Sequence, residues 1–252
     1  MKKTNKIIIA VVVILLLLVV GGVVIKNTTS NETETIQLAS VTNANIGDYI
    51  DLGNNIVGTE DTTDDWRILY VEEGKVYAIL ADYLPNSTGY AKTAGLNIND
   101  SKTGTSREYS VYSNTSKDTL LNGINTSSNW TGLANGISGV TVTGSPTAEL
   151  LIKSYNIKNA TNLVYTDNPT LDSSTIDYDL YVPHQDKIDN CSGYWLASSG
   201  EDWNSRLVKR VNYDGYVGNM GCGNDDTGIR PIISLSTDIK VIKGDGIWTV
   251  KD

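Results

Sequence analysis

The side chains best suited to contact a partner molecule lie between Gly200 and Gly228. Three aromatic residues in this stretch, Trp203, Tyr213 and Tyr216, are interspersed with Ser, Asn, Gly, Asp and Arg. Tyr and Trp provide large contact areas at a small entropic cost, and Ser, Gly and Asn provide adaptable hydrogen bonds. These residue types favour non-covalent ligand binding, although the composition alone fits a loop-rich edge equally well.

Catalytic chemistry has little support in the chain. The single histidine, His184, follows Pro183 without a second His or an HExxH pattern. It is therefore expected to be structural rather than a general base or a metal ligand. The GxSxG motif and the glycine-rich nucleotide-binding motifs are missing, and no pair of carboxylates stands out. We expect no enzymatic activity and no cofactor.

Two acidic loops contain oxygen atoms that calcium prefers. The residues concerned are Glu201, Asp202, Asn204, Asn224, Asp225 and Asp226. Their spacing is not that of an EF-hand, and solvated acidic turns are the simpler interpretation in a chain of net charge -9, so no metal site is predicted. Cys191 and Cys222 can form a disulfide or remain thiols, and the sequence leaves both possibilities open.

The start of the 252-residue chain predicts a membrane anchor. Lys2, Lys3 and Lys6 precede an uncharged apolar run over residues 7–25, which as a helix of about 19 residues spans roughly 28 Å. The positive-inside rule places everything after Lys26 outside the cell. A cleaved signal peptide is the alternative, but no small-x-small cleavage site follows the run. The acidic net charge argues against nucleic acid as a partner.

The rest of the chain divides into a polar stalk over residues 27–45 and one folded domain over residues 46–252. Within the domain, "WRILYV" and "KVYAILA" predict a hairpin closed at Gly74, and "RLVKRVNYDGYVGNM" predicts a second hairpin around Asp214-Gly215. "SPTAELLIKSYN" predicts a helix capped by Ser145, and "KDTLLNGI" predicts a shorter one. Because strands and helices do not alternate, the expected class is α+β, with the early hairpin meeting the C-terminal strands.

The segments "GYWLASS", "VNYDGYV" and "TGIRPIISL", together with "IGDYIDLG" and "DWRILYVEEGKVYAILADYLP", carry a family resemblance. The chain resembles the C-type-lectin-like proteins that diversity-generating retroelements diversify in bacteria and their phages. The resemblance covers most of residues 46–235. It implies a C-type-lectin-like fold of short antiparallel strands, two helices and long loops. It does not imply sugar binding.

In that family, codons for Asn are varied at their adenines, and the resemblance implies a variable region over about residues 199–228. Glu201, Trp203, Lys209 and Met220 cannot arise from such codons, so they are fixed or come from other codons. The residues expected to form the ligand-binding face are Asp202, Trp203, Asn204, Ser205, Arg206, Arg210, Asn212, Tyr213, Asp214, Tyr216, Gly218, Asn219, Gly221, Cys222, Asn224 and Asp225.

These features together predict a surface receptor or adhesin of a bacterial cell membrane. It is anchored through residues 7–25 and binds a protein or glycan ligand with its extracellular domain. One alternative is a structural or pilin-like surface protein without a variable site. The other is an enzyme on a lectin-like fold, as in the formylglycine-generating relatives, for which Cys191 and Cys222 are the available reactive groups.

Overall fold

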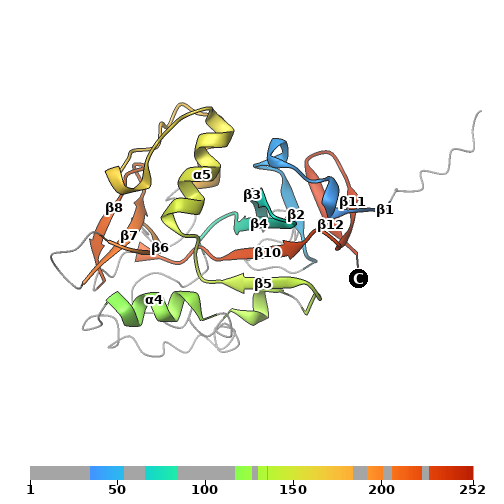
Figure 1. Cartoon of the computed structure of the whole chain (residues 1–252), viewed down its shortest axis with the longest axis horizontal. Coiled ribbons are helices and arrows are strands. Elements are labelled where there is room, and N and C mark those ends of the chain that lie inside the picture. Colours follow the sequence, from blue (N-terminus) through green and yellow to red (C-terminus); the bar gives the residue numbers. More distant parts are fainter. Residues whose placement is uncertain are drawn as a thin grey trace, which may run out of the picture. The chain divides into compact units, whose positions relative to one another are not determined.

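The part of the chain that the structure, a computed structural model, describes is built mainly from β-strands. It comprises residues 35–53, 66–83, 117–126, 130–134, 136–183, 192–200, 206–222 and 227–251. Within these residues, twelve strands form one sheet of eight and one sheet of four, accompanied by three α-helices (Figure 1).

The expected α+β, C-type-lectin-like fold with two helices is therefore wrong, because β-sheet dominates the described residues. Three of the observed strands were not predicted: β1 (Thr35–Gln37), β5 (Val140–Thr143) and β11 (Lys240–Lys243). Strand β1 lies within the predicted stalk, whereas β5, with the alternating sequence VTVT, carries a strand pattern that sequence reasoning missed. The folded part also reaches into the predicted stalk, since Leu38 and Val41 are buried in the core.

The predicted membrane anchor over residues 7–25 lies outside the described residues. Among the residues that are described, none of the helices has the length and apolar character needed to cross a bilayer.

The larger sheet has the strand order β1-β11-β12-β2-β3-β4-β10-β5. Its remaining strands are β12 (Ile247–Val250), β2 (Tyr49–Asp51), β3 (Trp66–Glu72), β4 (Lys75–Leu80) and β10 (Ile232–Ser236). Strand β10 pairs antiparallel with β4, and β12 pairs parallel with β2. The predicted meeting of the early hairpin with the C-terminal strands is confirmed.

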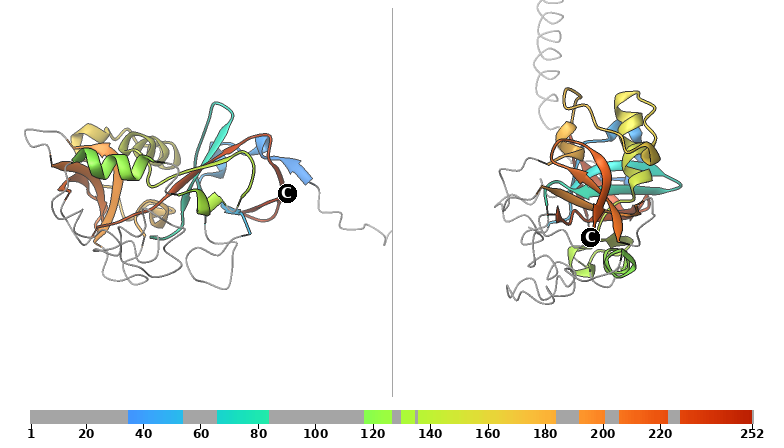
Figure 2. Two further views of the ribbon diagram at one scale, coloured as in Figure 1. Left: turned by 90° about the horizontal axis from the view of Figure 1, so that it is seen from below. Right: turned by 90° about the vertical axis from the view of Figure 1, so that its left-hand side faces the viewer.

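The smaller sheet has the order β8-β7-β6-β9. Its strands are β6 (Gly193–Ser199), β7 (Leu207–Asn212), β8 (Val217–Gly221) and β9 (Thr227–Gly228). Strand β6 contacts both α4 (Lys117–Asn125) and α5 (Ala148–Asn159). Figure 1 shows these two helices on opposite sides of the strands, and Figure 2 shows the same arrangement from two further directions.

Burial on both faces explains the long apolar runs of the central strands. In β3, Trp66 and Ile68 belong to the core cluster that includes α4, whereas Leu69 belongs to the cluster that includes α5. Strands covered on both faces lose the simple alternation of polar and apolar residues. The run "WRILYV" follows this rule.

The local predictions for helix α5 are confirmed except for its cap. Ala148, Leu151, Ile152 and Tyr155 form its buried face, as predicted. The side chain that caps the helix is that of Thr147, which accepts the Leu150 N–H, and not that of Ser145. The other two α-helices are α4, which was predicted, and the four-residue α6 (Tyr178–Tyr181), which was not.

The two sheets are joined at Arg230, in the link between β9 and β10. Its side chain is fully buried, and it donates to the carbonyl oxygens of Leu80 at 2.6 Å, Ala81 at 3.0 Å and Leu180 at 2.6 Å. Its guanidinium also lies 5.5 Å from the centre of the Tyr194 ring on β6. Burial lowers the pKa of Arg230 from its ordinary value, and the carbonyl groups and the ring offset this desolvation.

Replacement of Arg230 by Met is expected to lower the free energy of unfolding by about 3 kcal/mol, because it leaves buried carbonyl groups without a donor. Urea unfolding measures this effect. Arg206→Met is the matched control, since Arg206 is exposed, and it should change stability by less than about 0.5 kcal/mol. Equal effects of the two substitutions would contradict the role given to Arg230.

Candidate functional site

The predicted binding stretch folds as the hairpin of β7 and β8. Its loop is closed by two hydrogen bonds, from Gly215 N–H to the Asn212 carbonyl at 3.0 Å and from Asn212 N–H to the Tyr216 carbonyl at 2.9 Å. Gly215 has a φ of 81°, a left-handed conformation that favours glycine. The Asp214 carboxylate accepts the Tyr216 N–H at 3.1 Å. The predicted Asp-Gly hairpin is confirmed.

A second segment, Tyr165 to Leu171, lies along the turn end of this hairpin, and we call it the strap. Leu171 N–H donates to the Gly215 carbonyl at 3.0 Å, and Val217 N–H donates to the Pro169 carbonyl at 2.8 Å. Thr170 forms an isolated antiparallel bridge with Tyr216. The strap therefore extends the smaller sheet by a short fragment beyond β8.

Lys209 attaches the strap to the middle of the hairpin. Only 2% of this residue is exposed, and its ammonium group donates to Asn168 Oδ1 at 2.6 Å and to the Tyr165 carbonyl at 3.4 Å. Asn168 accepts this bond from a left-handed backbone conformation with φ of 49°. The sequence placed Lys209 outside the set of variable codons, and its burial gives it a structural role.

Helix α6 packs against the turn through Tyr178. A Cβ atom added at Gly215 would lie 2.6 Å from the Tyr178 hydroxyl oxygen, so the turn packs closely on this side chain. Burial, followed by the charge of Asp214, raises the pKa of Tyr178, which keeps its hydroxyl protonated at neutral pH. The turn is thus held by backbone bonds on one side and by an uncharged phenol beneath it.

The start of α6 is itself held by an ion cluster in which Arg67 is buried and its partners are partly exposed. Arg67 is 5% exposed and contacts Asp177 and Asp179, each at 3.0 Å. Lys158 of α5 contacts Asp177 at 2.8 Å. Burial is the largest single influence on the pKa of Asp179 and raises it, but the charge and hydrogen bond of Arg67, the charge of Arg230 and the Leu180 N–H together outweigh burial, and the pKa lies below its ordinary value. These contacts connect the larger sheet and α5 to the helix under the turn.

The exposed members of the predicted face lie at two ends of the hairpin. Tyr213 is 55% exposed and Tyr216 is 39% exposed, with Asp214 exposed between them at the turn. Arg206 is exposed at the other end, where its carbonyl accepts the Cys222 N–H at 2.8 Å. Gly221, at the same end, has open space where a side chain would start. Asn212 and Asn219 are half-buried.

Three predicted face residues are buried. Arg210 is 7% exposed and donates to Thr227 Oγ1 at 2.8 Å and to Ser192 Oγ at 3.2 Å. Cys222 is a fully buried thiol in the core cluster that includes α4. Gly218 is covered by the Tyr216 ring, which a side chain at position 218 would displace. The first two positions cannot contact a ligand directly, and the third positions Tyr216.

The remaining members of the predicted face lie outside the described residues. They are Asp202, Trp203, Asn204, Ser205, Asn224 and Asp225. His184 and Cys191 also lie outside them, as does the rest of the possible calcium loops, Glu201 and Asp226. Among the residues that are described, no three His, Cys, Asp or Glu side chains gather as a metal site.

Sequence reasoning missed the contribution of the strap and its neighbours. Six large apolar residues are exposed in the described part of the chain, and all come from the interval 157–216. Besides Tyr213 and Tyr216 they include Val164 and Tyr165, which begin the strap or immediately precede it. The sequence pattern around position 165 does not predict that the strap lies beside the hairpin, because only tertiary contacts bring the two segments together.

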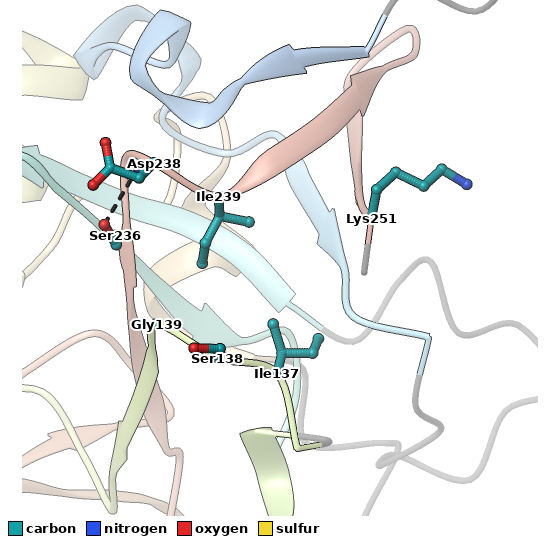
Figure 3. Close-up of a pocket in the computed structure, with 7 residues that line it drawn as sticks. All are labelled: Ile137, Ser138, Gly139, Ser236, Asp238, Ile239 and Lys251. Carbon is teal, nitrogen blue, oxygen red and sulfur yellow. Dashed lines mark hydrogen bonds between the residues drawn. The ribbon is translucent and has the colours of Figure 1, made fainter.

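A pocket of about 390 Å³ lies elsewhere, in the larger sheet at the turn between β10 and β11. In Figure 3, Asp238 and Lys251 are placed apart, and the Asp238 N–H donates to Ser236 Oγ at 3.3 Å. Ile137 and Ile239 supply its apolar lining. Because its polar groups do not converge, the pocket is a weaker candidate than the hairpin and its strap.

No family model, curated protein or solved structure matches this chain. The site is therefore interpreted from its own residues.

Substitution of Lys209 by Met is expected to loosen the strap, because it removes the donor to Asn168 and Tyr165 while keeping the buried aliphatic stem. Amide hydrogen exchange should become at least about tenfold faster at Leu171 than in the unsubstituted chain, which corresponds to about 1.4 kcal/mol of local opening. Lys243→Met on β11 is the control and should leave this amide unchanged. An unchanged exchange rate of the Leu171 amide in Lys209→Met would show that the backbone hydrogen bonds suffice to hold the strap.

Proposed function

We propose that this protein is a membrane-anchored, surface-displayed ligand-binding protein of a bacterial cell. Its binding face is the exposed surface of the β7–β8 hairpin and the adjoining strap. The observation that carries the proposal is the pair Tyr213 and Tyr216, exposed on a turn whose backbone is held by the strap and by α6. Rigid, exposed tyrosines lose little entropy when they bind a ligand.

The exposed side chains of the described hairpin favour ligand recognition over catalysis. The exposed groups are phenols, one carboxylate and one guanidinium, and they come from a turn and from the far end of the strands. Binding faces use such groups for contact area and hydrogen bonds. A protein or a glycan ligand fits this chemistry, and residues 7–25 would hold the domain at the membrane surface.

The same hairpin suits diversification by a retroelement, within limits set by burial. Asp214, which is exposed, and Gly221, which has open space where a side chain would start, accept substitution at little cost. Arg210 and Cys222 do not, since changing them would open the core or remove buried hydrogen bonds. We therefore propose a narrower variable set than the codon pattern implies.

The ligand face is tested by alanine substitution. The full chain, displayed on cells, is probed with a panel of cell-surface proteins and glycans, and the ligand found is titrated. Tyr213→Ala and Tyr216→Ala are each expected to weaken binding about tenfold or more, as residues central to an interface do. The circular dichroism spectrum should not change, since both side chains are exposed.

Thr141→Ala, at an exposed position on β5, is the control and should bind as the unsubstituted chain does. Loss of binding together with loss of folded structure would assign the tyrosines to the core. Full binding by both tyrosine variants would place the ligand site on another surface, and absence of any ligand in the panel would favour the structural surface protein.

Diversification is tested by sequencing the DNA around the gene in a clonal population. We expect a nearby near-copy of the codons for about residues 199–235, differing at adenines, beside a reverse-transcriptase gene. The codons for the exposed positions Tyr213, Asp214 and Tyr216, and for Gly221 with its open space, should differ from that copy. The codons for Lys209, Arg210, Val211 and Cys222 should match it.

Absence of such a copy would leave a fixed binding protein. Variation concentrated at the buried codons would contradict the assignment of the face.

A further inference from the structure

Among the described residues, strand β8 forms one edge of the smaller sheet, and the strap pairs only with its first residue. The edge strands of the two sheets are β1, β5, β8 and β9, with 3, 4, 5 and 2 residues, so β8 is the longest among the described residues. Its sequence, VGNMG, contains no charge and no proline. Natural proteins usually protect edge strands with these features or by making them very short.

The register shows which backbone groups of β8 face outward. Asn212 N–H bonds the Tyr216 carbonyl, and Cys222 N–H bonds the Arg206 carbonyl. In an antiparallel pair, such bonded positions alternate with positions that point away. Val217, Asn219 and Gly221 therefore direct their N–H and C=O groups away from β7.

The strap covers only the first of these three positions. Val217 donates to Pro169 at 2.8 Å, and the left-handed backbone of Asn168 then turns the strap away from the edge toward Lys209. Within the described part of the chain, no strand pairs with β8 on this side beyond Val217. Asn219 and Gly221 thus remain at an open edge.

This open edge is complementary to itself. If two β8 strands pair antiparallel about a twofold axis at Met220, Asn219 of one copy lies opposite Gly221 of the other. Each such pair is of the kind that exchanges two hydrogen bonds. Gly221 has open space around it, so the opposing Asn219 side chain is accommodated. Each strap bonds at Val217, two residues along the strand from the Asn219–Gly221 pair.

We propose that the protein forms a twofold dimer in which the two β8 edges pair, with a second copy of this chain as the partner. The edge itself contains no charged residue, so pairing places no like charges directly opposite each other, although each chain carries a net charge of -9. Twofold pairing consumes both edges and stops at the dimer. It joins two hairpins in one assembly, so the turns with Tyr213 and Tyr216 can bind a ligand bivalently.

The first test is oxidative cross-linking of the full chain in detergent. Met220→Cys places a thiol at the proposed axis, in a pair without mutual hydrogen bonds whose Cα atoms are about 4.5 Å apart, within reach of a disulfide. We expect a covalent dimer with this variant and none with Thr141→Cys, which is exposed on β5 of the other sheet. Equal cross-linking of the two variants, or none with Met220→Cys, overturns the proposal.

The second test introduces no cysteine and measures the sedimentation of the same full chain. Asn219→Pro removes only an outward N–H group, which edge strands tolerate, and it should raise the dimer dissociation constant roughly tenfold or more. Asn219→Ala keeps the N–H group and should dimerise as the unsubstituted chain does. A chain that stays monomeric at all concentrations contradicts the dimer.

Hydrogen exchange identifies any other occupant of the edge. In the dimer, the Asn219 and Gly221 amides should be protected, and the protection should disappear on dilution. Protection that persists in the monomer would assign the edge to another segment of the same chain. Protection that appears only when a foreign protein binds would assign it to a ligand. Both results would overturn the second copy as partner.

Discussion

The buried guanidinium of Arg230 is the interaction on which the rest of the structure depends. It lies where the chain passes from the smaller sheet to the larger one, and it satisfies carbonyl groups at the end of β4 and in α6. A buried cation is tolerated only where several acceptors surround it. The directional bonds of Arg230 add to the two core clusters, which both contain residues of the two sheets, in positioning the smaller sheet and the hairpin it carries.

The second constraint is that both faces of the strands are covered. Helix α4 and helix α5 contact β6 on its two sides, which leaves solvent access to the smaller sheet mainly at its edge and at its turns. Arg67 and Lys158 then fix the start of α6 beneath the turn through Asp177. Exposed tyrosines are consequently carried by a backbone that is restrained on several sides, an arrangement that favours recognition by a preformed surface.

Burial divides the residues of the hairpin into those that tolerate substitution and those that do not. Val208, Val211 and Val217 belong to the two core clusters. The codon pattern alone does not reveal this division, because buried and exposed positions alternate irregularly.

The sequence by itself determined the local elements. Periodicity and turn residues predicted the β3–β4 hairpin, the Asp-Gly hairpin and helix α5, because these depend on neighbouring residues. Only the tertiary structure decided the dominance of β-sheet, since β1 and β5 pair with β11 and β10, which lie far away in the chain. It also decided the burial of Arg210 and Cys222 and the position of the strap beside the hairpin. Those outcomes depend on contacts between segments far apart in the chain, and no local pattern records them.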